Sequence, residues 1–423
     1  MYILEDFLLS LQDFLVSRKE YDHNIIRKHT KKLDELGEIS FPLCINKWST
    51  LIDNKNVAHV GITTILQYKY PKSDKDSLLN ILITESSNWK IQIKQINVKN
   101  NDAHIFFNKS FDLFRVVIQD VLEHSDTYGF SDIIKNNVII KISPNIESSD
   151  INQLDLTNLR LKLLKDISTN FIMQNTSKST SNTCNVYLVL NPVEKDKKTI
   201  LCGPVVNEKS VKSTYKASEL YKKRSADMRM MAQHKYGIQV KLNPSWENYF
   251  DNLGTGSVTI EMLTNKPQKS IKITPNDLQS ANKGAAFIFY NCARLSALFK
   301  EFDKRVSMRE YPELPNCNDI DFSLLKQPEE WELFYVYIIQ FPMVIKSCIK
   351  DVEKGIINPQ HLIYFLSNLS SSFSIYYRRV RILTNPKEHM FSIIHARIYL
   401  LKALQCVFHN SLRLLNVDPV REM

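Results

Sequence analysis

Hydrophobic residues are spaced differently in three successive regions of the chain. In residues 1–135, short apolar runs alternate with charged turns. Apolar runs bounded by turn residues predict three strands: Val57–Leu66, Leu78–Ile83 and, with a break in register, Ile91–Val98. Ser110 then precedes apolar residues at intervals of three and four, which predicts a capped helix that ends near Gly129. We expect an α/β domain here.

The second region, residues 136–283, begins with β-branched residues at Val138–Ile142, which predict a buried strand. A leucine stripe predicts a helix at Leu156–Ile167, and the polar segment Gln174–Asn185 predicts a linker. A second strand is expected at Asn185–Leu190. The order strand, helix, strand favours part of a parallel α/β layer.

The third region, residues 284–423, is predicted to be helical because its apolar residues recur at helical spacing. Pro328 and Pro359 suit the first turns of two helices, since a proline there removes no hydrogen bond. Long apolar stripes predict two further helices, at Ala286–Phe302 and near the end of the chain. The expected arrangement is an antiparallel bundle of four to six helices.

Glycine is scarce, at 9 of 423 residues, where average composition would give about 30. Neither GxGxxG nor GxxxxGK[ST] occurs, so a nucleotide-hydrolysing or dinucleotide-binding enzyme is not expected. The seven cysteines form no CxxC pair and the ten histidines form no HxxxH pair. The sequence therefore predicts no metal site and no cofactor.

The formal charge of +10 is concentrated between Lys195 and Lys241, where twelve basic residues stand with four acidic ones. Such a stretch attracts polyanions, and a nucleic-acid backbone is the commonest target. A solvated basic face without specificity is the alternative, and charge alone leaves both open.

The segment Met1–Val16 is rich in Leu and Phe, but Glu5, Asp6 and Asp13 interrupt it. A signal peptide would need an uninterrupted apolar centre, so we expect an amphipathic helix instead. Reading the chain for uninterrupted apolar runs reveals none near the roughly 18 residues of a membrane span. The expectation is a cytoplasmic protein without a membrane partner.

Three segments of the third region carry a more specific pattern: AAFIFYNCARLSAL, SSSFSIYYRRVRIL and ARIYLLKALQCVFHNSLRLLNVDPVREM. Together they resemble the DALR domain, the anticodon-binding helical bundle of arginyl-tRNA synthetases. Phe287, Tyr290, Ala293 and Arg294 match the synthetase pattern on the first helix. Met423 matches the methionine on which those enzymes end.

Upstream, HIFFNKSFDLFRVVIQDVLEHSDTYG and VIIKISPN are similar to the end of the tRNA-contacting N-terminal domain and to the first catalytic strand of the same synthetases. The resemblance implies an N-terminal α/β domain at 1–135. It also implies a degenerate class I synthetase Rossmann-like core at 136–283, followed by an all-α DALR anticodon-binding bundle at 284–423.

Both ATP signatures of the synthetases are altered. The His-x-Gly-His stretch reads Asp155–Arg160, without either histidine or the glycine, and the second signature is matched only in part by Lys212–Ala217. An aspartate near a triphosphate would repel it. The resemblance therefore implies a protein that does not form adenylates.

Four further segments are similar to the family of DALR anticodon-binding domain-containing protein 3: Leu201–Val205, Val258–Leu263, KGAAFIFYNCARLSALF and Asp319–Leu325. The resemblance implies a non-catalytic adaptor that recognises particular arginine tRNAs. It also implies delivery to a partner, a SAM-dependent methyltransferase of the methyltransferase-like family that makes 3-methylcytidine in the anticodon loop.

Proteins read the unstacked bases of an anticodon by stacking and by hydrogen bonds to base edges. Phe287, Tyr290 and Arg294 share one helix face, and the resemblance implies that Tyr290 stacks and Arg294 reaches a base or phosphate. The alternative for Phe287 and Tyr290 is a place in the core.

Other tRNA-binding residues follow from the same resemblance: Tyr377, Arg378, Arg379, Arg381, Met423, Phe107, Asn108 and Lys109. Arg381 is placed near the bases, Arg378 and Arg379 on phosphates, and the Met423 sulfur on a base. A solvated turn with extended arginines is the alternative for the 377–381 cluster. Phe107, Asn108 and Lys109 align with a region that contacts the outer corner of tRNA.

Two functions compete with the adaptor. A divergent arginyl-tRNA synthetase would bind ATP through other groups near Asp155–Arg160. A scaffold would keep the fold but bind only protein.

Overall fold

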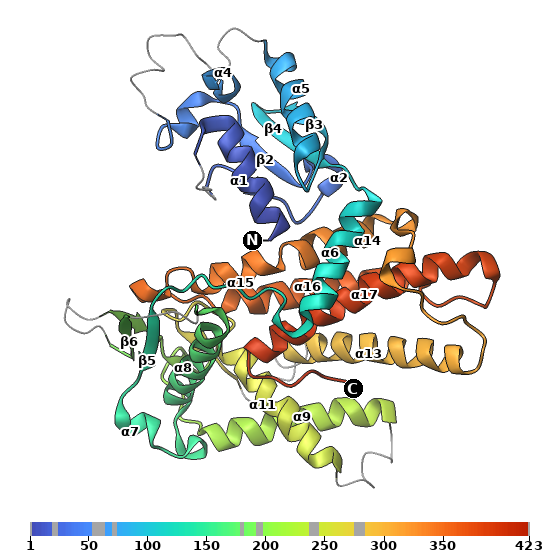
Figure 1. Ribbon diagram of the computed structural model, residues 1–423. Helices are drawn as coiled ribbons and strands as arrows, with labels where there is room; N and C mark the ends of the chain where they lie inside the picture. The colour runs from blue at the N-terminus through green and yellow to red at the C-terminus, as the bar shows by residue number, and fades with distance from the viewer. Residues whose placement is uncertain are drawn as a thin grey trace. The chain divides into compact units, whose positions relative to one another are not determined.

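The computed structural model of the protein describes residues 2–18, 24–52, 64–69, 74–177, 182–191, 198–236, 245–274 and 284–421. The chain divides into two compact units (Figure 1). The first contains Met1–Gln119 and Asn316–Gln340, and the second contains Asp120–Pro315 and Phe341–Met423. The division into domains at 1–135, 136–283 and 284–423 stays a prediction.

A four-stranded antiparallel sheet of order β1–β2–β4–β3 lies in the first unit. Its strands are β1 (Arg27–Lys28), β2 (Ile39–Pro42), β3 (Ile93–Lys99) and β4 (Asp102–Phe107). Asn100 and Asn101, both with positive φ, join β3 to β4 in the left-handed conformation that tight hairpins require. A register shift between Ile93 and Gln95 confirms the predicted break in this strand.

The first unit also contains the helices α1 (Ile3–Val16), α2 (Leu33–Leu36), α4 (Ile65–Lys69), α5 (Lys75–Glu85), α14 (Pro328–Glu332) and a π-helix (Leu333–Ile339). Helix α6 (Phe111–His124) begins in the first unit and ends in the second. The Leu113 N–H donates to Ser110 Oγ at 3.2 Å, which confirms the predicted cap of α6.

The strand predicted at Leu78–Ile83 is wrong, because these residues belong to α5. The side chain of Asp74 caps that helix by accepting from the Ser77 N–H at 2.9 Å. Most of the strand predicted at Val57–Leu66 lies outside the described residues, and Ile65 and Leu66 belong to α4.

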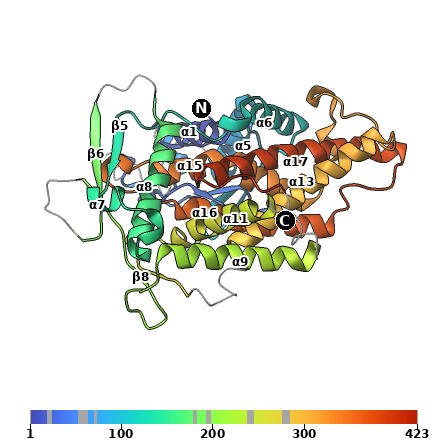
Figure 2. The same cartoon turned by 90° about the horizontal axis from the view of Figure 1, so that it is seen from below.

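The second unit contains a parallel sheet of order β5–β6–β7 and a smaller pair, β8–β9. The strands are β5 (Asn137–Lys141), β6 (Thr183–Val189), β7 (Thr199–Leu201), β8 (Val205–Val206) and β9 (Ile271–Lys272). Helix α8 (Leu156–Asn175) connects β5 to β6 and packs beside both (Figure 2). The predicted parallel strand–helix–strand unit is confirmed.

Most of the second unit is helical: α7 (Pro144–Glu147), α9 (Ala217–Tyr236), α11 (Ser245–Met262), α13 (Ala285–Ser307), α15 (Phe341–Ile349), α16 (Gln360–Arg379) and α17 (Glu388–Leu414). Helices α13, α16 and α17 pack side by side (Figures 1 and 2). Their apolar stripes meet in a core that includes Phe289, Leu366 and Leu404, all fully buried.

Among the described residues, two helical stretches, Pro328–Lys354 and Glu388–Leu414, are long and apolar enough to cross a membrane by length and composition alone. Of their most apolar windows, 72% and 67% is buried inside the protein. A helix covered on most sides is apolar on most sides, so this composition fits core helices. Reading the sequence for uninterrupted apolar runs missed both stretches.

Candidate nucleic-acid interface

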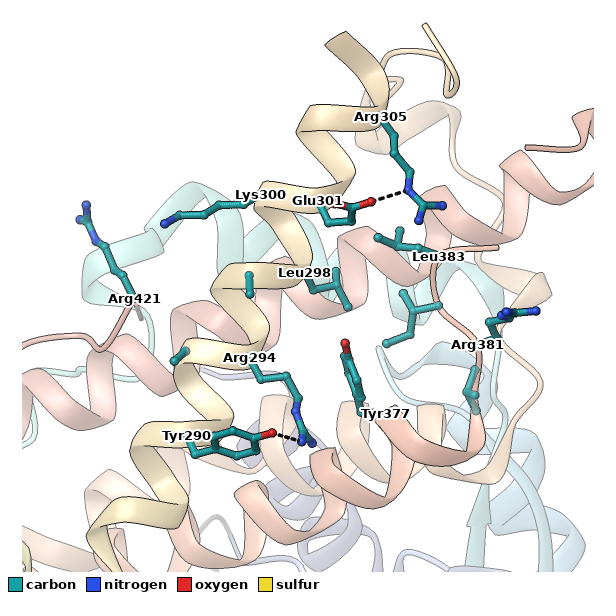
Figure 3. A pocket seen from close by; sticks show the side chains of 14 residues that line it. Tyr290, Arg294, Leu298, Lys300, Glu301, Arg305, Tyr377, Arg381, Leu383 and Arg421 are labelled. Atoms are coloured by element: carbon teal, nitrogen blue, oxygen red, sulfur yellow. Dashed lines mark hydrogen bonds and ion pairs between the residues drawn. The ribbon is translucent and has the colours of Figure 1, made fainter. Parts of the chain in front are cut away.

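A cavity of about 770 Å³ opens in the second unit between α13, the end of α16 and the loop that follows it (Figure 3). Helix α13 contributes Tyr290 and Arg294, α16 contributes Tyr377, and the loop contributes Arg381. Arg421, near the end of the chain, also lines the cavity. Residues far apart in the sequence therefore share one surface.

Arg294 lies between two tyrosine rings. Its guanidinium carbon is 4.5 Å from the ring centroid of Tyr290 and 4.7 Å from that of Tyr377. Its Nη2 donates to the Tyr290 hydroxyl at 2.6 Å (Figure 3). Its Nη1 is buried and has no hydrogen-bond partner among the described residues. Because an unsatisfied buried donor costs about 1–3 kcal/mol, this group favours a ligand that brings an acceptor.

The rings beside Arg294 are accessible to a ligand. Tyr290 is 38% exposed and Tyr377 is 39% exposed. Aromatic rings that are neither buried nor fully solvated offer flat surfaces on which a base can stack. The alternative of a core position, left open by the sequence, is wrong for Tyr290.

Positive charge dominates the walls of the cavity. Its basic side chains are Arg294, Lys300, Arg305, Arg381 and Arg421. Within the described part of the chain, Glu301 is the one acidic residue of these walls, and it accepts from Arg305 Nε at 2.8 Å. This balance attracts anions.

Three predicted residues of the third region lie apart from the cavity. Phe287 is half-buried on α13, and Arg378 and Arg379 are exposed at the end of α16. Each residue turns about 100° around a helix axis, so the neighbours of Tyr377 point elsewhere. Met423 lies outside the described residues.

In the first unit, Asn108 and Lys109 line a second cavity of about 550 Å³ together with Glu38 and Lys94. The Lys109 Nζ stands 5.0 Å from the ring centroid of Trp331, and burial lowers the pKa of this lysine. Glu38 accepts from the Trp331 Nε1 at 2.6 Å, and burial raises the pKa of its carboxyl.

Phe107 belongs to the lining of the same cavity, but its predicted contact with tRNA requires a correction. Its side chain is 1% exposed and packs edge-on against Phe7 and Tyr335 in the core of the first unit. The ring of Phe107 is therefore not available to a tRNA.

Sequence reasoning missed Lys300, Glu301, Arg305 and Arg421. Glu301 and Arg305 follow Arg294 by seven and eleven residues on α13, so helical spacing could have found them. No comparable local signal marks Arg421, which tertiary folding brings to the cavity.

The two segments that resemble the ATP signatures lie together in the second unit. Asp155 caps α8 by accepting from the Asn158 N–H at 2.8 Å, and it forms an ion pair with Lys212 Nζ at 3.0 Å. Arg160 is 1% exposed and donates to four backbone carbonyls, those of Gly203, Met262, Lys266 and Lys269. These side chains already have partners within the protein.

In the described part of the basic stretch between Lys195 and Lys241, several cations already pair with carboxylates of the protein. Lys212 pairs with Asp155, and Arg229 Nη2 lies 3.2 Å from Glu247 Oε1. Arg224 is fully buried, where it binds both Glu261 oxygens at 2.8 and 2.9 Å. Arg224 therefore joins α9 to α11 inside the protein and is not available to a nucleic acid.

Sequence comparison places the cavity in a known kind of domain. The family model of the DALR anticodon binding domain matches residues 288–423. DALR anticodon-binding domain-containing protein 3 of Danio rerio is 30% identical over 237 residues, which is 53% of this chain and 41% of that protein. The Rattus norvegicus protein of the same name is 31% identical over 228 residues, 53% of this chain and 42% of that protein. The aligned part thus spans less than half of these relatives.

Enzymes are also among the relatives. An arginine–tRNA ligase of Geobacter metallireducens is 28% identical over 197 residues, 44% of this chain and 32% of that protein.

Solved structures agree on the fold. The arginyl-tRNA synthetase of Thermus thermophilus matches with a TM-score of 0.64 at 10% identity, over 99% of each chain. That of Plasmodium falciparum matches with a TM-score of 0.56 at 11% identity, over 100% of each chain. The predicted fold class is confirmed. The chain therefore carries a C-terminal DALR anticodon binding domain on an arginyl-tRNA synthetase-like fold, and is similar to DALR anticodon-binding domain-containing protein 3.

Proposed function

We propose that this protein is a non-catalytic, cytoplasmic tRNA-binding adaptor that recognises arginine tRNAs through the anticodon loop and delivers them to a SAM-dependent methyltransferase for 3-methylcytidine formation. The observation that carries the RNA-binding part is the state of Arg294. This side chain lies between Tyr290 and Tyr377, in a basic cavity of the DALR domain, and one of its buried donors has no partner in the part of the chain that the structure describes.

The chemistry of the cavity suits an unstacked nucleotide. A base stacked on the exposed ring of Tyr290 or Tyr377 would contribute about 1–3 kcal/mol. The Nη1 of Arg294 would donate to an acceptor on the base edge. Lys300, Arg381 and Arg421 surround this place with positive charge, which suits the flanking phosphates.

The choice of arginine tRNA and of a methyltransferase partner rests on the resemblance to DALR anticodon-binding domain-containing protein 3. The absence of catalysis is supported by the partners of Asp155, Arg160 and Lys212. A divergent synthetase would have to free these groups from an ion pair and from four carbonyls before they could meet ATP.

The decisive experiment measures binding of the purified protein to an arginine tRNA and to a tRNA of another amino acid by fluorescence anisotropy. Arg294→Ala should weaken binding of the arginine tRNA by roughly 5- to 100-fold, because it removes a stacked, hydrogen-bonding group. Arg309→Ala is the matched control, since Arg309 is exposed just beyond α13 and lies outside the cavity walls.

Equal losses in the two variants would show that general charge, and not the cavity, holds the RNA. A protein that binds no tRNA at all, and whose protein partners remain after RNase treatment, would be the scaffold that competes with this proposal.

A further inference from the structure

The loop 380–387, between α16 and α17, forms one wall of the cavity. It contributes Arg381, Ile382 and Leu383 to the lining (Figure 3). Residues 381–386 make no backbone–backbone hydrogen bond within the described part of the chain. The backbone itself therefore does not fix the position of Arg381.

Side chains from α13, from the segment that follows it and from α17 hold this loop. Arg305 Nη1 on α13 donates to the Thr384 carbonyl at 3.0 Å, and the Tyr311 hydroxyl donates to the same oxygen. The Tyr311 hydroxyl in turn accepts from Arg305 Nη1 at 3.0 Å. On α17, Arg397 Nη1 donates to the carbonyl of Arg381 itself at 3.2 Å.

Tyr311 and Arg397 contact the loop 380–387 from within the protein. Tyr311 is 3% exposed and Arg397 is 6% exposed, and neither lines the cavity, so neither can touch a ligand bound there. Arg305 differs because it also lines the cavity and could meet the ligand directly. An effect of Tyr311 or Arg397 on binding would thus have to act through the loop.

We propose that Tyr311 and Arg397 are positioning residues for RNA binding, which hold the loop 380–387 so that Arg381 meets a backbone phosphate. This inference rests on the proposed function, because it needs RNA in the cavity. The physical reason is that ordering a loop and its side chain on binding costs conformational entropy. If the loop is already fixed in the free protein, the contact between Arg381 and a phosphate contributes more to the binding free energy.

Tyr311→Phe is the sharpest test, because it removes one hydroxyl and leaves the ring in its contacts with Phe302 and Phe391. The variant should bind arginine tRNA about 2- to 10-fold more weakly, as expected for the loss of a hydrogen bond. Although no charge changes, the slope of log K against log salt should shrink by about 0.7, one phosphate contact to a single strand.

Arg381→Ala should reduce the slope by the same amount. The double variant, Tyr311→Phe with Arg381→Ala, should lose no further affinity, because both substitutions remove the same phosphate contact. Arg397→Met, which removes the donor but keeps an apolar stem, should behave like Tyr311→Phe. Tyr364→Phe is the matched control: Tyr364 is 53% exposed on α16, and its loss of a hydroxyl should leave affinity and slope unchanged.

An unchanged salt slope in Tyr311→Phe, with a reduced slope in Arg381→Ala, overturns this inference and leaves the proposed function intact. Failure of the wild-type protein to bind tRNA overturns both.

Discussion

Three arginine side chains, buried at Arg160 and Arg224 and half-buried at Arg294, meet three kinds of partner. Arg160 donates to backbone carbonyls, Arg224 binds carboxylates, and Arg294 lies between tyrosine rings. Arg294 alone among these three has a buried nitrogen without a hydrogen-bond partner in the described residues. The same residue type is therefore structural at two positions and a candidate ligand-binding group at the third, and the surroundings decide which.

His409 on α17 makes stability depend on pH. Burial, followed by the charges of Arg421 and Arg413, lowers its pKa to about 4 from an ordinary value of 6.5. Between pH 6.5 and about 4 the unfolded chain therefore binds more protons at this residue than the folded protein. The contribution of neutral His409 to the free energy of unfolding is complete above pH 6.5 and is lost as the pH falls through this window.

Urea unfolding at pH 7 and pH 4.5 tests this dependence. His409→Gln should lose less stability than the wild type between the two values, because glutamine cannot take up the proton. His389→Gln, at an exposed position in the first turn of the same helix, should keep the wild-type dependence. If His409→Gln and the wild type lost equal stability, protonation of His409 would not contribute.

At the scale of elements, sequence patterns predicted helices better than they predicted contacts. The unit β5–α8–β6 was predictable because buried β-branched runs and a long leucine stripe differ clearly in period. Leu78–Ile83 was misassigned because a short apolar run fits both a strand and a helix, although Asp74 and Ser77 carry a readable cap.

Part of the candidate site was predictable from the sequence, and part of it was not. Tyr290 and Arg294 share one helix face, so spacing was enough to pair them. Tyr311, Arg397 and Arg421 reach the cavity or its loop only through the packing of distant segments, and no local pattern marks such neighbours.

The contact between α9 and α11 depends on a buried charge. Arg224, 0% exposed, joins Asp227 of its own helix to Glu261 of α11. Arg224→Met should lower the free energy of unfolding by about 3–5 kcal/mol, because it removes the positive partner of Glu261 and leaves buried Asp227 with Lys223 alone. Urea unfolding measures this loss.

Arg229→Met is the matched control on the same pair of helices. Arg229 and Glu247 form an ion pair whose side chains are 45% and 69% exposed, and such pairs contribute about 0–1 kcal/mol. A similar loss in both variants would contradict the role assigned to Arg224.

Two regions of this synthetase-like fold differ in whether their polar side chains already have partners within the protein. The positions that resemble the ATP signatures are engaged within the protein: Asp155 with Lys212, and Arg160 with four carbonyls. The DALR domain instead keeps a cavity with accessible tyrosines and a donor that lacks a partner in the described structure. We therefore expect this protein to bind RNA but not ATP.

Thermal unfolding with each ligand tests that separation in one preparation. Arginine tRNA at 100 times its Kd should stabilise the folded protein by about 2.7 kcal/mol and raise the Tm. Millimolar ATP with magnesium and arginine should leave the Tm unchanged, and arginine-dependent ATP–pyrophosphate exchange should be absent. A Tm raised by ATP, together with such exchange, would mean that Asp155 and Arg160 release their partners and that the chain is a divergent arginyl-tRNA synthetase.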